Sequence, residues 1–239
     1  MTANELKKLL LVKSDNLFEF TSPEYDDEHI SLILTDAQRR VVLRKYNPLG
    51  NKYQKGFEND ELRRSELNEL IKPYSITSLS SNQIGVHQDG VFVDLPNDHF
   101  LTIEESVRLN GMSKDSSVKP VTHDEYSANI ENPYKAPYEK KVWRMDISKV
   151  TQPIGTTAGS SKRTELILPT GRTMTKYSCR YIINPPAIVC DEDTPTNQMH
   201  CILSENTQAE IVDEAVSIIK GATKPEEYQI SLSEGQRSQ

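Results

Sequence analysis

The sequence predicts an α+β protein with an N-terminal helical layer, an antiparallel β-rich middle that carries a long loop, and a C-terminal helix that packs back on the helical layer. Two changes of pattern along the chain predict this class. Apolar residues recur with a period near 3.6 in the first third of the chain and again after residue 206. Between residues 85 and 189 they alternate with polar residues, which is typical of half-buried strands.

The first third of the chain is predicted to contain three helices. A short apolar helix covers residues 6–12, and a second helix begins after Pro23 and ends by Asn47-Pro48, because proline cannot continue a helix. A third is expected from about Asn59 to Ile71. The second helix has one apolar stripe, formed by Ile30, Ile33, Leu34, Ala37 and Val41.

The middle of the chain is predicted to form strands over residues 91–95, 101–109, 143–147, 166–168 and 177–183. The turn sequence Pro96-Asn97-Asp98 predicts that the first two strands form a hairpin, and the later strands are expected to pair antiparallel. Thr122 and Glu125 have the spacing of a capping box and predict a short helix over residues 122–131. The polar stretch 148–163 is predicted to be an exposed loop.

The last part of the chain is predicted to form one amphipathic helix and a tail. Thr207 and Glu210 again have capping-box spacing, and Gly221 supplies a stop signal. The expected organisation is therefore a helical region over residues 1–74, a β region over 75–190, a helix over 204–221 that joins the helical region, and a mobile tail over 222–239.

Composition excludes several function classes. The net charge of -7 argues against non-specific binding of nucleic acid, since an acidic surface repels phosphates. No apolar run is long enough for a signal peptide or a membrane span, so we expect a soluble chain. The apolar fraction of 36% is low for a domain of 239 residues, which favours long loops or apolar burial between subunits.

The sequence carries no catalytic signature. The three cysteines form no C-x-x-C pair, and a zinc site that adds His200 is a poorer explanation than three reduced thiols. Gly155 to Thr164 lacks the glycine that a phosphate-binding loop places before its lysine. No G-x-S-x-G turn is present, and His123 is explained by its place in a helix first turn. We therefore predict no catalytic, cofactor-binding or metal-binding residue and no enzyme activity.

The candidate functional residues are contacts. Arg39, Arg40, Arg63 and Arg64 are expected to make ion pairs between subunits, with solvated helix faces as the alternative. Trp143 is expected to pack in the core or to anchor an interface. Ile154, in the long loop, is expected to make an interface contact.

Several strings occur together in a consistent order, namely 57–67, 91–98, 120–126, 132–137 running into 142–144, and 210–216. Jointly they resemble structural proteins of the crAss-like phages of gut Bacteroidetes, and the helix from Ile30 to Lys45 is similar to one in head-to-tail adaptor proteins of tailed phages. The resemblance implies a head-to-tail connector, or neck ring protein, of a short-tailed bacteriophage.

The same resemblance implies the partners and location of the chain. Copies would form a dodecameric ring at the portal vertex of the virion, bound to the portal protein and to adjacent ring or tail proteins. Genomic DNA would pass through without sequence-specific binding, and the chain would be made in the host cytoplasm and need no cofactor or membrane. Alternatives are a carbohydrate- or host-surface-binding tail module, with Tyr134, Tyr138 and Tyr177 as its aromatic residues, and a hydrolase.

Overall fold

A computed structural model describes residues 1–14, 25–47, 57–77, 85–147, 162–191 and 198–223. The chain divides into two compact units, a helical unit (Met1–Leu70 and Pro185–Gln239) and a sheet unit (Ile71–Asn184). Helices and a seven-stranded sheet confirm the α+β class. Most of the predicted loop 148–163 and all but two residues of the predicted tail lie outside the described residues.

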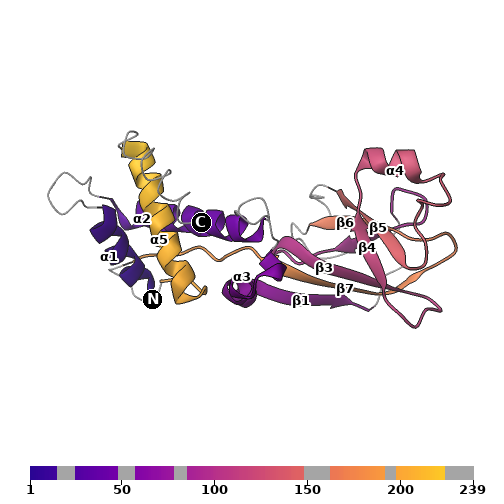
Figure 1. Cartoon of the computed structure of the whole chain (residues 1–239), viewed down its shortest axis with the longest axis horizontal. Helices are drawn as coiled ribbons and strands as arrows, with labels where there is room; N and C mark the ends of the chain where they lie inside the picture. The colour runs from indigo at the N-terminus through magenta and orange to yellow at the C-terminus, as the bar shows by residue number, and fades with distance from the viewer. Residues whose placement is uncertain (15–24, 48–56, 78–84, 148–161, 192–197, 224–239) are drawn as a thin grey trace. The chain divides into compact units, whose positions relative to one another are not determined.

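The helical unit contains α1 (Ala3–Ser14), α2 (Asp27–Tyr46), α3 (Glu61–Leu67) and α5 (Glu205–Thr223) (Figure 1). As predicted, α5 packs back against α1 and α2. The α2 stripe is buried in this contact, apart from the half-buried Ile33. The core of the unit is formed by Leu6, Leu10, Ile30, Leu34, Ala37, Val41, Ile211, Val212 and Ala215.

The end of the third predicted helix and the predicted cap and stop signals of the last helix are wrong for identifiable reasons. The third helix ends at Leu67 and a 3-10 turn (Asn68–Leu70) follows, because Ile71 already pairs with Ile182 in the sheet. Helix α5 begins before Thr207 and continues through Gly221. Thr207 is therefore no N-cap, since its buried hydroxyl contacts Ser204 Oγ at 3.0 Å within the first turn.

The sheet unit contains β1 (Ile71–Ile76), β2 (Gly90–Asp94), β3 (His99–Leu109), β4 (Ser116–Pro120), β5 (Lys141–Ile147), β6 (Arg163–Ile167) and β7 (Met174–Ile183), in the order β1-β7-β3-β4-β5-β6-β2. Neighbouring strands pair antiparallel except β4 and β5, which run parallel. A parallel pair needs a crossover connection, and the helix α4 (His123–Asn129) with its following loop supplies it.

The predicted hairpin between β2 and β3 does not form. Strand β2 pairs with β6 at one edge of the sheet, whereas β3 pairs with β7 and β4. Side-chain contacts hold β2 on β6, because Arg163 Nε and Nη2 donate to the two Asp94 carboxylate oxygens at 2.6 and 3.2 Å. The alternation of apolar and polar residues identifies a strand but not the strand that pairs with it, so it could not reveal that β2 pairs with β6.

The sheet curls until its two edge strands approach each other. The Tyr74 hydroxyl of β1 donates to the Asp94 carbonyl of β2 at 3.1 Å. Next to the crossover, Tyr126 and Ile130 pack against a buried cluster formed by Val121, Trp143, Met145 and Ile167. The predicted capping box is confirmed at the start of α4, where Thr122 Oγ1 accepts the Glu125 N–H at 3.2 Å.

Candidate assembly surfaces

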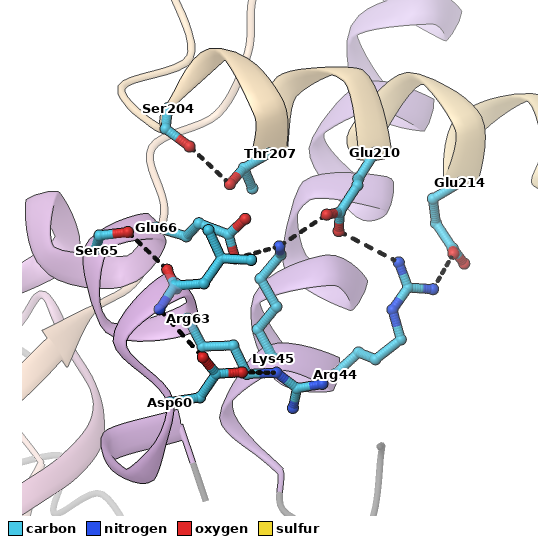
Figure 2. A network of polar contacts seen from close by, with 11 residues as sticks. Arg44, Lys45, Asp60, Arg63, Ser65, Glu66, Ser204, Thr207, Glu210 and Glu214 are labelled. Carbon is cyan, nitrogen blue, oxygen red and sulfur yellow. Dashed lines mark hydrogen bonds and ion pairs between the residues drawn. The ribbon is translucent and has the colours of Figure 1, made fainter. Parts of the chain in front are cut away.

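An ion-pair network joins three helices of the helical unit (Figure 2). Lys45, near the end of α2, places its Nζ 2.6 Å from Glu66 Oε2 of α3 and 2.9 Å from Glu210 Oε1 of α5. The Lys45 and Glu66 side chains are only 9% and 7% exposed. A buried pair of this kind is costly to desolvate, and removal of one partner leaves an uncompensated buried charge, which is costlier still.

Arg44 extends the network toward solvent. Its Nη1 lies 2.8 Å from Glu214 Oε2 and its Nη2 4.0 Å from Glu210 Oε2, so α2 and α5 share two arginine–glutamate contacts (Figure 2). The predicted capping role of Glu210 is thereby corrected, because its carboxylate faces Lys45 and Arg44. Sequence reasoning did not identify this network, since its members are far apart along the chain and have ordinary helix spacing.

The structure separates the predicted pair Arg63 and Arg64. Arg63 is partly buried, and its Nε lies 3.6 Å from Oδ2 of Asp60, the residue that caps α3 (Figure 2). Arg64 is exposed and makes no ion pair with any described residue. Arg63 therefore has a role inside its own subunit, and Arg64 is the better candidate for a contact between subunits.

Arg39 and Arg40 lie on the exposed side of α2 together with Leu32 and Leu43. Arg40 Nη2 contacts Asp36 Oδ2 at 2.9 Å, and both side chains of this pair are about half exposed. An exposed pair one helical turn apart contributes only about 0.3–0.5 kcal/mol. Little stability would therefore be lost if Arg40 exchanged Asp36 for a carboxylate on another molecule.

Exposed side chains, two of them acidic, surround Leu62 on α3 and on the 3-10 turn that follows it. Leu62 is 60% exposed. Ser65 follows it one turn later in α3, Glu69 lies in the 3-10 turn (Asn68–Leu70), Glu61 precedes it, and all three are exposed. Neither glutamate forms an ion pair with any residue in the described part of the chain. We call Glu61, Leu62, Ser65 and Glu69 the α3 face.

The residues after α4 form a loop that displays two tyrosines. Tyr134 is 95% exposed and Tyr138 is 53% exposed, and Lys135 and Lys140 beside them are also exposed. We call Tyr134, Lys135, Tyr138 and Lys140 the tyrosine loop. The third tyrosine expected of a sugar-binding platform, Tyr177, is fully buried, which disfavours that alternative.

Trp143 lies in the core of the sheet unit rather than on its surface. It is 4% exposed, and the Tyr126 ring meets its ring edge-on with centroids 6.3 Å apart. This placement favours core packing over the interface role that the sequence also allowed. Ile154, the other apolar candidate contact, lies outside the described residues.

Three buried polar side chains inside the curled sheet are paired with one another. Glu105 of β3 accepts hydrogen bonds from Arg144 Nη1 and from the Tyr177 hydroxyl, each at 2.6 Å. Burial and the Glu105 carboxylate raise the pKa of Tyr177 above its ordinary value, so the phenol stays protonated. The network crosses β4 and ties β5 to β3 and β7, which is a structural role.

A second buried carboxylate holds the segment that leads into β2. Glu165 is fully buried, and its Oε1 accepts the His87 N–H at 2.8 Å while its Oε2 lies 2.7 Å from His87 Nδ1. The Tyr126 ring covers His87 edge-on at 4.4 Å. A His–carboxylate pair can orient a base, but His87 contacts no Ser or Cys among the described residues that could act as its nucleophile.

The cysteines also have the properties of structural residues. All three are free and buried. Burial raises the pKa of the Cys179 thiol to about 11 and that of Cys201 above its ordinary value, so neither is a thiolate at neutral pH. Within the described residues, no group of three or more His, Cys, Asp or Glu could hold a metal ion, and no helix is long and apolar enough to span a membrane.

Two compact units with exposed charged and aromatic side chains define a protein whose distinctive surfaces suit assembly. The chain belongs to the phage tail ring protein 3/4 family, whose model matches residues 1–227. It is 30% identical to "Ring protein 4/5" of Bacteroides phage crAss001 over the whole of both chains. It is also 29% identical to "Ring protein 3" of the same phage, over 69% of this chain and 68% of that protein. The resemblance to crAss-like phage ring proteins is thereby confirmed.

Proposed function

We propose that copies of this chain form a closed ring at the portal vertex of the virion, where the ring gives a conduit for genomic DNA and a platform for tail assembly. Family membership over residues 1–227 carries this proposal. A ring of identical subunits needs heterologous contacts, in which one surface of a subunit meets a different surface of the next. The neighbours along the particle axis would be the portal protein and other ring or tail proteins.

The distribution of charge supports a structural role. The exposed arginines Arg39, Arg40 and Arg64 supply basic contacts on a chain whose net charge is -7. An acidic ring would weaken adhesion of the DNA backbone, because like charges repel and phosphate binding depends on cationic side chains. We propose no catalytic role for the subunit, since Glu165 holds His87 in place and burial raises the pKa of the Cys179 and Cys201 thiols.

Native mass spectrometry and negative-stain electron microscopy of the purified chain test the proposal, first alone and then with the portal protein of the same phage. We expect a closed ring of high order, or a defined complex with the portal protein. A chain that stays monomeric and ignores the portal protein would contradict the position at the vertex.

Charge reversal then tests the arginine contacts. Arg39→Glu/Arg40→Glu and Arg64→Glu should each raise the protein concentration needed for half-assembly by about tenfold. The circular dichroism spectrum should stay unchanged. Arg63→Glu is the matched comparison, because it disturbs Asp60 at the start of α3 and should lower stability as well. Normal rings from the first two variants would exclude these arginines from the interface.

A further inference from the structure

Backbone hydrogen bonds hold the tyrosine loop, although its two tyrosine rings are exposed and make no ring contact with a described residue. Asn132 starts it, accepting the Tyr134 N–H on its side-chain oxygen at 3.0 Å and the Lys135 and Ala136 N–H groups on its carbonyl at 3.0 and 2.8 Å. Tyr138 and Lys141 exchange both backbone hydrogen bonds at its end, at 3.0 and 2.8 Å.

The strands beside the loop also fix it. Ser116 Oγ donates to the Glu139 carbonyl, and the Ser117 N–H and hydroxyl both donate to the Lys140 carbonyl, at 3.0 and 3.1 Å. The Arg172 guanidinium pairs with the Glu139 carboxylate. Ordering a loop on binding costs conformational entropy. Because these hydrogen bonds already order the loop in the free subunit, binding a partner would not incur that cost.

A tyrosine exposed on a prearranged loop is chemically suited to anchor a protein contact. Tyrosine offers a large apolar ring with a polar tip, and it is enriched among residues that dominate binding energy. Tyr134 and Tyr138 are the only aromatic residues among the large apolar side chains that are exposed in the described part of the chain. Lys135 and Lys140 make no ion pair with a described residue, so the loop also carries unpaired positive charge.

The α3 face has the complementary chemistry. Leu62 supplies an exposed apolar group, and Glu61 and Glu69 are exposed carboxylates that form no ion pair with a described residue. We propose that the tyrosine loop of one subunit binds the α3 face of the next subunit in the ring, with Tyr134 and Tyr138 against Leu62 and the two lysines facing the two glutamates. The inference rests on the proposed ring and names one contact that closes it. The two patches differ, as a head-to-tail contact requires.

Charge exchange between separate chains tests this contact. One variant carries Lys135→Glu/Lys140→Glu and the other Glu61→Lys/Glu69→Lys. Each alone should need more than about tenfold higher concentration to assemble, because like charges then face each other. An equimolar mixture should assemble like the wild type, since every alternating contact pairs opposite charges again. A mixture that assembles no better than either variant would overturn the proposal.

Substitution of the anchor gives an independent measurement. Tyr134→Ala should raise the concentration for half-assembly by about 30-fold. Val86→Ala is the matched control, because Val86 is 79% exposed on the same unit but lies outside the loop. Circular dichroism and Trp143 fluorescence should be unchanged in both variants. Equal assembly of the two would contradict an anchoring role for Tyr134.

Disulfide trapping locates the contact and separates its failure from failure of the ring. A chain with Tyr134→Cys and Leu62→Cys should oxidise to a ladder of covalent oligomers, whereas a mixture of the two single variants should stop at dimers. Wild-type rings without such a ladder would overturn this contact alone, and a wild-type chain without self-association would overturn the ring as well. Duplex DNA binding that Lys135→Glu/Lys140→Glu abolishes while rings persist would assign the loop to DNA instead.

Discussion

His99 lies buried at the start of β3, where its ring stacks on Tyr181 with centroids 5.2 Å apart and its Nε2 lies 2.9 Å from Thr102 Oγ1. Its Nδ1 has no hydrogen-bond partner among the described residues. Burial, with the positive charges of Lys162 and Arg144 nearby, lowers the pKa of His99 from 6.5 to about 4. The folded protein therefore keeps this ring neutral where the unfolded chain already protonates it.

This difference makes the stability of the sheet unit depend on pH. Between pH 6.5 and about 4 the unfolded state binds more protons at His99, so the free energy of unfolding falls as the pH falls through this window. The loss attributable to His99 should be about 2–3 kcal/mol. In His99→Gln this part of the pH dependence should disappear, although stability at neutral pH will be lower.

Urea unfolding followed by Trp143 fluorescence measures this effect, because the single tryptophan reports on the sheet unit. The slope of stability against pH is compared between wild type and His99→Gln, so that the other titrating groups cancel. Equal slopes in the two proteins would contradict the prediction, because they would mean that His99 binds the same number of protons in the folded and unfolded states.

At the scale of elements, periodicity predicted the helices and strands whose buried residues recur with the helical or strand period. The α2 stripe and the Thr122 capping box were predictable because helix geometry alone places their atoms. Strands β1 and β4 were missed because β1 contains Lys72 and Pro73 at the sheet edge, and β4 has only Val118 as a large apolar side chain. Their pairing is imposed by neighbouring strands, which no local pattern records.

The candidate contacts were predictable only in part, for the same reason. The sequence identifies Arg39, Arg40 and Arg64 as charged helix positions, but the exposure of Leu62 and Tyr134 depends on which side of each element faces the core. The buried pair of Lys45 and Glu66 is equally invisible, since the two residues lie 21 positions apart. Long-range packing decides these features.

The three-helix network should stabilise the helical unit through Lys45. Lys45→Met leaves the Glu66 carboxylate buried without its cation, so the free energy of unfolding should fall by about 3–5 kcal/mol. The double variant Lys45→Met/Glu66→Leu should recover much of this loss, because no buried charge remains.

Circular dichroism at the helical band, followed through a urea titration, measures both variants. Lys13→Met is the matched control, because Lys13 pairs with Asp213 at the surface, and its loss should cost less than about 1 kcal/mol. If Lys45→Met and Lys13→Met destabilised the protein equally, the network would have no special role in joining α2, α3 and α5.

At the scale of the whole molecule, the sheet unit is an insertion into the helical unit. The helical unit contributes residues on both sides of it, and the chain enters the sheet at Ile71 and leaves it after Ile183. These ends are adjacent, since Ile71 pairs with Ile182. An inserted unit with adjacent ends can fold without holding the flanking segments apart.

We therefore expect residues 71–184 to fold when expressed alone, because the seven strands find all their sheet partners within this range. The matched comparison is residues 75–190, the span that periodicity suggested. It lacks Ile71–Tyr74 and with them most of β1 and the bond from Tyr74 to Asp94. This shorter sheet should lose about 2 kcal/mol or more of stability.

Cooperative urea unfolding of both fragments, followed by Trp143 fluorescence, measures the difference. Equal midpoints would mean that β1 adds nothing to the sheet, and an unfolded 71–184 fragment would mean that the sheet needs the helical unit to fold.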